Sequence, residues 1–131
     1  MKKIISAFIL FYIFTMLVAC ENSVSNNTDL RSLKAPVISV KEINARNNIV
    51  SILAVASWSD GCGSFSHYSV NSNNKDISIV IYVNKPSELA CPAVMISFDA
   101  PIDIVVDGAG DYNFHFWQTD STSLDTTFTV R

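Results

Sequence analysis

Charge is scarce in this 131-residue chain, and its few basic residues form no cluster. Lys, Arg, Asp and Glu make up 16 % of the residues, below the roughly 25 % of ordinary soluble domains. A nucleic-acid partner is not expected, because such partners are held by clustered Lys and Arg. The hydrophobic content of 49 % is ordinary for a folded protein, so wholesale disorder is not expected either. The length suits one domain and not two.

Helix signals are equally scarce, whereas strand signals recur after Pro36. Short runs of β-branched and aromatic residues are separated there by Asn, Asp, Gly, Ser and Pro, which is typical of strands and turns. One run, Ile49–Ser57, is apolar almost throughout, so a buried helix remains an alternative for it. The predicted strands are Val37–Ile43, Ile49–Ser57, Cys62–Val70, Asp76–Val83, Ala93–Phe98, Ile102–Val106, Tyr112–Gln118 and Thr126–Val130.

The spacing of these runs predicts an all-β fold. Seven or eight short strands with turn signals every 8 to 12 residues favour an antiparallel sandwich of two sheets. The run Asp76–Val83 alternates apolar and mixed positions, as a half-buried strand does. Pro101 cannot donate to a sheet ladder, so we expect a bend that splits 93–106 into two strands.

The N-terminus has the features of an export signal. Lys2 and Lys3 precede an apolar run from Ile4 to Ala19, and residues 17–20 read Leu-Val-Ala-Cys. This ending resembles the lipobox of bacterial lipoproteins. The resemblance implies a signal peptide at 1–19, cleavage before Cys20 and acylation of Cys20. The alternative, an uncleaved transmembrane helix, is short, since sixteen residues at about 1.5 Å each do not span a core of about 30 Å.

The lipoprotein resemblance also implies a location. Glu21 follows the cysteine, whereas Asp at that place is associated with retention at the inner membrane, so the outer membrane is favoured. Residues 20–35, rich in Asn and Ser, are predicted to be a flexible tether, and 36–131 the folded domain. Loss of Lys2 and Lys3 leaves seven basic and twelve acidic residues, a net charge of −5. An acidic domain is repelled by anionic lipid, so we expect it to stand off the membrane.

Three cysteines are present, an odd number for an exported protein. If Cys20 carries lipid, Cys62 and Cys91 remain as a pair in an oxidising compartment, and a disulfide between them is predicted. Two free buried thiols, or a metal-binding or nucleophilic thiol, are the alternatives. No zinc-type spacing supports a metal, since His67 and His115 lie apart from the cysteines.

The step Gly110-Asp111-Tyr112 resembles the tyrosine corner of immunoglobulin-like domains, in which a Tyr bonds back to the preceding chain. Phe114 stands where those domains usually have a Cys. The general layout is similar to small envelope lipoproteins of immunoglobulin-like type. This resemblance implies a fold and no particular activity.

No catalytic constellation is evident. His67 and His115 are candidates for a general base or a ligand, but neither has a partner motif beside it. The serines around Gly61 lack the Gly-x-Ser-x-Gly elbow of hydrolases. Four aspartates recur at a spacing that does not fit an EF-hand calcium loop, so no metal and no cofactor are expected. These aspartates are Asp99, Asp103, Asp107 and Asp111.

The segment from Trp58 to Phe65 is a candidate contact loop, with Trp58, Asp60 and Phe65 as its named residues. A disulfide at Cys62 would hold these side chains rigidly, and rigidity lowers the ordering cost of binding. The function expected is therefore a lipid-anchored binding or assembly module without catalysis, whose partner is an envelope protein or a glycan. A small envelope hydrolase that uses a His/Asp pair and a protease inhibitor that presents sandwich loops are the alternatives.

Overall fold

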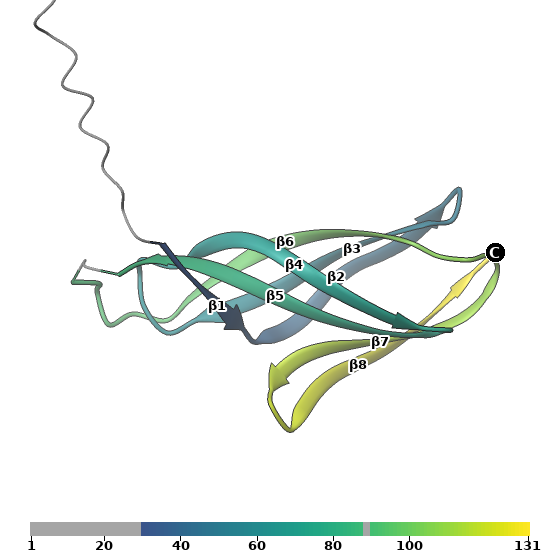
Figure 1. Ribbon diagram of the computed structural model, residues 1–131. Helices are drawn as coiled ribbons and strands as arrows, with labels where there is room; N and C mark the ends of the chain where they lie inside the picture. Colours follow the sequence, from purple (N-terminus) through teal and green to yellow (C-terminus); the bar gives the residue numbers. More distant parts are fainter. Residues whose placement is uncertain (1–29, 88–89) are drawn as a thin grey trace, which may run out of the picture.

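The computed structural model describes residues 30–87 and 90–131, which fold into eight strands (Figure 1). The predicted signal peptide and Cys20 lie outside these residues. In the part of the chain that the structure describes, no helix is long and apolar enough to cross a membrane. The strands are β1 (Leu30–Ala35), β2 (Val37–Arg46), β3 (Ile49–Trp58), β4 (Ser64–Asn73), β5 (Asp76–Pro86), β6 (Ile96–Val105), β7 (Gly110–Thr119) and β8 (Thr122–Val130).

The strands form two sheets, which confirms the predicted two-sheet all-β sandwich. Strands β2, β3 and β6 make a three-stranded antiparallel sheet with β3 in the centre. The other sheet contains β1, β4, β5, β7 and β8. The chain passes from one sheet to the other at Pro36, between β1 and β2, and the Pro36 carbonyl accepts a hydrogen bond from the Ser57 N–H at 2.9 Å.

Strand β5 has three partners. Strand β4 pairs antiparallel with it along one edge. Two strands share its other edge. The N-terminal half of β5 pairs in parallel with β7, with Ile77 opposite Phe114 and Ile79 opposite Phe116. The C-terminal half, from Ile81 onward, pairs antiparallel with β1. The parallel β5–β7 pair departs from the wholly antiparallel arrangement expected. Nothing in a single strand's alternation distinguishes the two directions.

The core lies between the sheets and is formed by the inward positions of alternating strands. The predicted alternation of β5 and β7 is confirmed, because one face of each strand is buried. The apolar β3 is a strand and not a helix. It is the central strand of its sheet, with β2 and β6 on its two edges. The largest fully buried side chains are Val37, Val50, Ile77, Ile79, Ile81, Val83, Ile102, Phe114 and Phe116.

The two ends of the sandwich are built differently. One end, here called the turn end, holds the β2–β3, β4–β5 and β6–β7 connections (Figure 1). Asn47 and Asn48 both have positive φ (52° and 62°), the combination that a tight two-residue hairpin turn requires. The Tyr112 hydroxyl donates to the Gly108 carbonyl at 2.9 Å, which is the back-bond expected of a tyrosine corner.

The opposite end, here called the tip, holds the longer β3–β4 and β5–β6 connections (Figure 1). Cys62 and Cys91 form a disulfide there, with Cα atoms 5.5 Å apart, as predicted. The first residue of β1, Leu30, pairs with Pro86 at the same end.

Two predictions about boundaries are wrong. Pro101 does not split its strand: β6 runs unbroken from Ile96 to Val105, and Pro101 pairs in register with Leu53. In the described residues β6 pairs only with β3, so it is an edge strand. A proline on an edge strand can place its nitrogen on the unpaired side, where the lack of an N–H removes no hydrogen bond between strands. The predicted tether, 20–35, is also too long, because Leu30–Ala35 forms β1.

Candidate functional site

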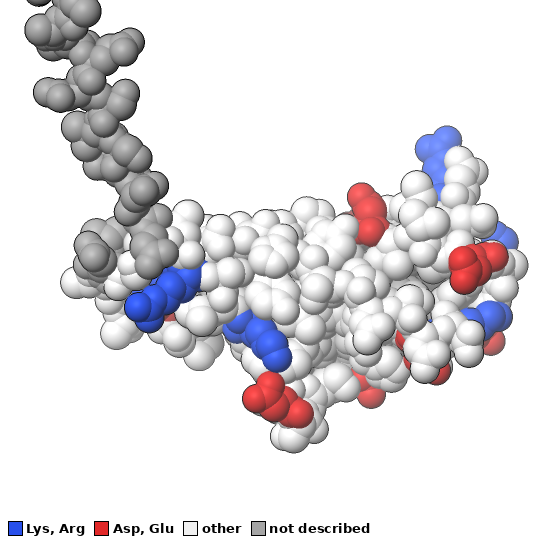
Figure 2. Space-filling model, viewed as in Figure 1, with Lys and Arg blue, Asp and Glu red and all other residues white. Residues whose placement is uncertain are grey.

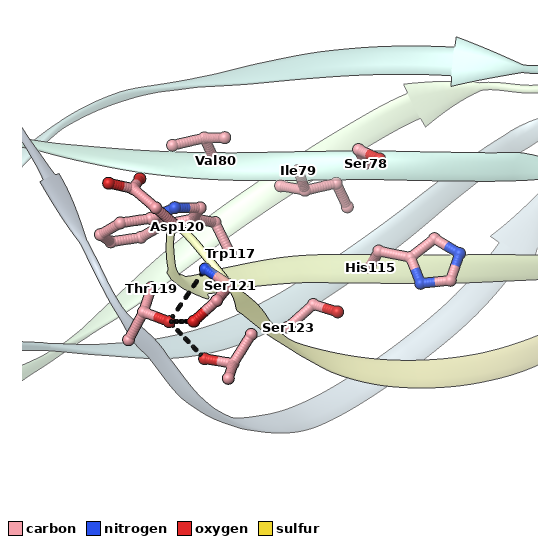
Figure 3. Close-up of a pocket in the computed structure, with 10 residues that line it drawn as sticks. Ser78, Ile79, Val80, His115, Trp117, Thr119, Asp120, Ser121 and Ser123 are labelled. Atoms are coloured by element: carbon pink, nitrogen blue, oxygen red, sulfur yellow. Dashed lines mark hydrogen bonds between the residues drawn. The ribbon is translucent and has the colours of Figure 1, made fainter.

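A cleft of about 420 Å³ opens where β7 separates from β5, and we call it the fork cleft (Figure 3). Ile79 is the last β5 residue paired with β7, and Ile81 is the first paired with β1. Gln118 then leans to the other sheet, where its side-chain amide donates to the Val37 carbonyl at 2.9 Å. The lining residues are Ser78, Ile79, Val80, His115, Trp117, Thr119, Asp120, Ser121, Thr122 and Ser123.

The β7–β8 turn shapes one wall of the fork cleft. The Thr119 hydroxyl bonds to the Thr122 hydroxyl at 2.7 Å and accepts from the Ser121 N–H at 3.2 Å (Figure 3). Lys34 of β1 lies over the Trp117 ring at 5.2 Å and 3.6 Å from an Asp120 oxygen. The wall is therefore rich in hydroxyls and is fixed by its own hydrogen bonds.

His115 stands at the edge of the fork cleft between two carboxylates. Its Nδ1 is 2.9 Å from Asp125 of β8, and its Nε2 is 3.7 Å from Asp76 of β5. The hydrogen bond to Asp125 raises the pKa of His115. Partial burial lowers this pKa, but the negative charges of Asp125 and Asp76 raise it further. Asp125 also accepts from the Ser123 hydroxyl at 2.7 Å, and these two hydrogen bonds lower the pKa of Asp125.

This geometry suits an ionic clamp better than a catalytic base. In a Ser-His-Asp arrangement one ring nitrogen faces the carboxylate and the other faces the nucleophile. Here the second nitrogen of His115 faces Asp76, and the nearby Ser123 hydroxyl donates to Asp125.

His67 lies elsewhere, on the edge strand β4. Its ring stacks on Tyr82 with centroids 4.6 Å apart, and its Nδ1 is 2.9 Å from the Ser66 hydroxyl. The register shifts between Phe65 and His67, so Ser66 occupies a β-bulge. The structure does not bring His67 and His115 together on one site, because they flank β5 from opposite sides.

The tip forms a second, covalently fixed constellation. The Asp60 side chain is only 13 % exposed, and it pairs with Lys85 at 2.6 Å. It also accepts from the Cys62 N–H at 3.0 Å. The hydrogen bond from Lys85 lowers the pKa of Asp60, and burial opposes this. The Gly61 N–H donates to the Pro92 carbonyl at 3.0 Å, so the two tip loops are joined by a hydrogen bond as well as by the disulfide.

The residues of the predicted contact loop point inward. Trp58 is half-buried and lies against Gly63, where any Cβ would overlap the indole. Phe65 packs at a tilt against Phe98 with centroids 6.4 Å apart, and Asp60 is engaged by Lys85. The tip instead exposes Val94 and Met95, which the sequence analysis did not single out.

The remaining candidates do not converge on one site. Asp99 pairs with Lys41 across the three-stranded sheet at 2.6 Å, and Asp111 accepts from Thr129 at 2.6 Å on the other sheet. Among the described residues, one group of acidic, His or Cys side chains is close enough to share a metal ion, and it consists of Asp60, Cys62 and Cys91. Its sulfurs are joined in the disulfide.

Sequence reasoning missed Asp76 and Asp125 as partners of His115. A regular two-residue turn at Asp120 and Ser121 would place His115 opposite Thr126, but the register shifts between Trp117 and Thr119 and brings His115 opposite Asp125. That partner depends on the bulge, which the hairpin pattern does not indicate. Asp76 depends on the parallel β5–β7 pairing, which is not evident in the sequence either.

Comparison with known proteins adds a family. No curated protein and no solved structure matches the chain. A family model, the ORF11 beta-sandwich domain, matches residues 52–130, which is more than half of the chain and extends from β3 to β8. The matched residues include the disulfide, the fork cleft and the tyrosine corner. The chain therefore belongs to the ORF11 beta-sandwich domain family.

Proposed function

We propose that the protein is a lipid-anchored, non-catalytic binding module of the bacterial cell envelope, with the fork cleft as its ligand site. The anchor is supported by the lipobox-like residues 17–20 and by the charged, apolar stretch before them. Glu21 supports the outer membrane. The tyrosine corner at Tyr112 supports an immunoglobulin-like relationship for the sandwich.

The lining of the fork cleft is the observation that carries the binding role. Hydroxyls from Ser78 and the β7–β8 turn, the Asp120 carboxylate and the Trp117 ring surround a volume of about 420 Å³. This is within the roughly 300 to 1,000 Å³ of small-ligand sites. Sugars offer many hydroxyls for such groups and an apolar face for an aromatic ring. A glycan of the envelope is therefore the ligand that the chemistry fits best.

Two measurements test this function. Radiolabelled palmitate should enter the full chain in cells and should not enter Cys20→Ala, which tests the anchor. Calorimetric titration of the detergent-solubilised protein with soluble peptidoglycan fragments and lipopolysaccharide oligosaccharides tests the cleft. We expect binding that Asp120→Asn weakens at least tenfold, about 1.4 kcal/mol. The matched control is Asp111→Asn, on the same sheet face but outside the cleft. Failure of every glycan to bind, or equal binding by both variants, would overturn the cleft assignment.

The His115–Asp125 distance of 2.9 Å at the edge of the cleft favours one second candidate, a small envelope hydrolase. If the protein is a hydrolase, purified full-length protein will cleave ester or glycoside substrates. His115→Gln and Asp125→Asn will then abolish turnover, and Asp111→Asn will not. We expect no turnover from any of the four proteins, because the second ring nitrogen of His115 faces Asp76.

A further inference from the structure

The tip exposes a small apolar surface, Pro92–Met95, which we call the tip patch. Val94 is 51 % exposed and Met95 76 % exposed, and Pro92 and Ala93 are exposed beside them. Single exposed apolar residues need no explanation, but here four follow one another in the chain. The patch is also a loop and not the outer face of a sheet.

The tip patch is held in place by several contacts. Cys91 precedes it and is bonded to Cys62, and the Pro92 carbonyl accepts from both Gly61 and Val94, at 3.0 and 2.8 Å. The Val94 side chain lies against Gly61. A loop fixed in this way loses little conformational entropy when it contacts another surface, so its apolar side chains are available for binding at low cost.

The chain toward the proposed lipid anchor leaves the domain at this same end. Leu30, itself 53 % exposed, begins β1 at the tip, and Cys20 is ten residues earlier. Ten residues reach at most about 33 to 36 Å when fully extended, which limits the distance between Leu30 and the lipid. The tip is thus kept close to the membrane whenever Cys20 carries lipid.

Charge at the described part of the tip does not oppose this orientation. At the tip, Asp60 is paired with Lys85, and Arg31 lies beside Lys85 on the paired strand. Figure 2 shows basic side chains at both the tip and the turn end, and most of the acidic side chains on this face toward the turn end. The turn end holds Arg46 and Lys75 as well as acidic residues. Among the described residues of the tip, the carboxylate is neutralised by Lys85, so anionic lipid meets no unpaired negative charge there.

We propose that the tip patch inserts into the interfacial layer of the membrane that carries the anchor, and so holds the domain upright on the bilayer. This inference rests on the lipid anchoring in the proposed function, and it revises the expectation that the acidic domain stands off the membrane. The occupant of the patch is the lipid surface itself. The turn end then points away from the bilayer, because the two ends are opposite (Figure 1).

The test uses the full, lipidated chain with Trp117→Phe, so that Trp58 near the tip is the remaining tryptophan in the domain. The protein is reconstituted in phosphatidylethanolamine and phosphatidylglycerol vesicles whose acyl chains are brominated near the headgroup. We expect Trp58 emission to be quenched relative to unbrominated vesicles. Val94→Asp with Met95→Asp should remove most of the quenching, because charged side chains do not enter the interface readily.

The matched control is Val105→Asp, which changes an equally apolar residue, 79 % exposed, on the outer face of the three-stranded sheet near the turn end. It should leave the quenching unchanged. Circular dichroism establishes that all variants fold.

If palmitate does not enter the protein, the anchor and this inference both fail. If palmitate enters but Trp58 is not quenched, or the double variant is quenched like the parent, the anchor stands and the inference is wrong. A shift from dimer to monomer in the double variant without quenching would likewise overturn it, and would assign the patch to a second copy.

Discussion

The two ends of the sandwich solve the problem of connecting strands in different ways. The turn end uses tight connections, with positive φ at Asn47, Asn48 and Asn74 and a back-bond from Tyr112. The tip uses two longer loops joined by the Cys62–Cys91 disulfide. Local backbone conformation fixes the short connections, whereas the longer loops of the tip are joined by a covalent bond and flanked by the part-buried Asp60–Lys85 ion pair.

This contrast has a functional side. The tight turns of the turn end are built with polar residues such as Asn47, Asn48 and Asn74, whereas the fixed loop at the tip exposes apolar residues. The tip patch is such a surface. The difference between the ends indicates that the disulfide serves presentation as well as stability.

Removal of the disulfide should give the largest effect and should act on the tip. We expect Cys62→Ser with Cys91→Ser to lower the free energy of unfolding by about 3 to 4 kcal/mol, because a loop of about thirty residues is no longer closed in the unfolded chain. Amide exchange should accelerate at Gly61 and Val94, whose N–H groups bond within the tip. Exchange at Val106, bonded to Asn48 at the turn end, serves as the internal control. Equal acceleration at both ends would contradict the separation of the two.

Loss of the tyrosine corner should be smaller and should act on the turn end. Tyr112→Phe removes one hydrogen bond to the Gly108 carbonyl while the ring keeps its packing, so we expect a loss of about 1 kcal/mol. Denaturant unfolding measures the loss, and amide exchange locates it. A change confined to the tip, or no change at all, would show that the corner does not fasten this end.

The smallest effect should come from His115, midway along β7. Because its pKa is raised in the folded protein, the clamp contributes its full stability below about pH 6.5, the unfolded value, and loses it as the pH rises through the higher folded pKa. The pKa of Asp125 is lowered, so the contribution is also lost as the pH falls well below 3.8. We expect the smallest of the three effects, because ion pairs between exposed groups contribute little to stability. Thermal unfolding of the parent and His115→Gln across pH 5 to 9 measures it. A difference that grows with pH would refute the assigned direction.

Much of the fold was predictable because one face of several strands is apolar. Alternation identified the buried residues of β5 and β7, and the turn residues located most connections. Residues whose neighbours decide their role were harder to predict. Pro101 was tolerated because β6 is an edge strand, and sheet position cannot be read from local sequence. Leu30–Ala35 has no sustained pattern that would predict a strand, and it is pairing with β5 that makes it one.

The candidate site was less predictable than the fold. Cysteine counting found the disulfide, since pairing in an exported protein is a matter of arithmetic. The fork cleft arises where β7 and β1 share one edge of β5, and the two segments are about eighty residues apart in the sequence. The residue pattern within β1 or within β7 does not indicate that a cleft forms between the two strands. His115 was identified only as a candidate, because its two carboxylate partners come from different strands.

The outer edge of β6 affects whether neighbouring molecules can associate through their sheets. An edge strand with free donors and acceptors invites another chain to extend the sheet, and crowding increases that hazard. Pro101 has no N–H to offer and its ring occupies the approach, so this edge is a poor template for intermolecular ladders. Pro101 does not interrupt β6 within the molecule, and it disfavours pairing of this edge with a strand of a neighbouring molecule.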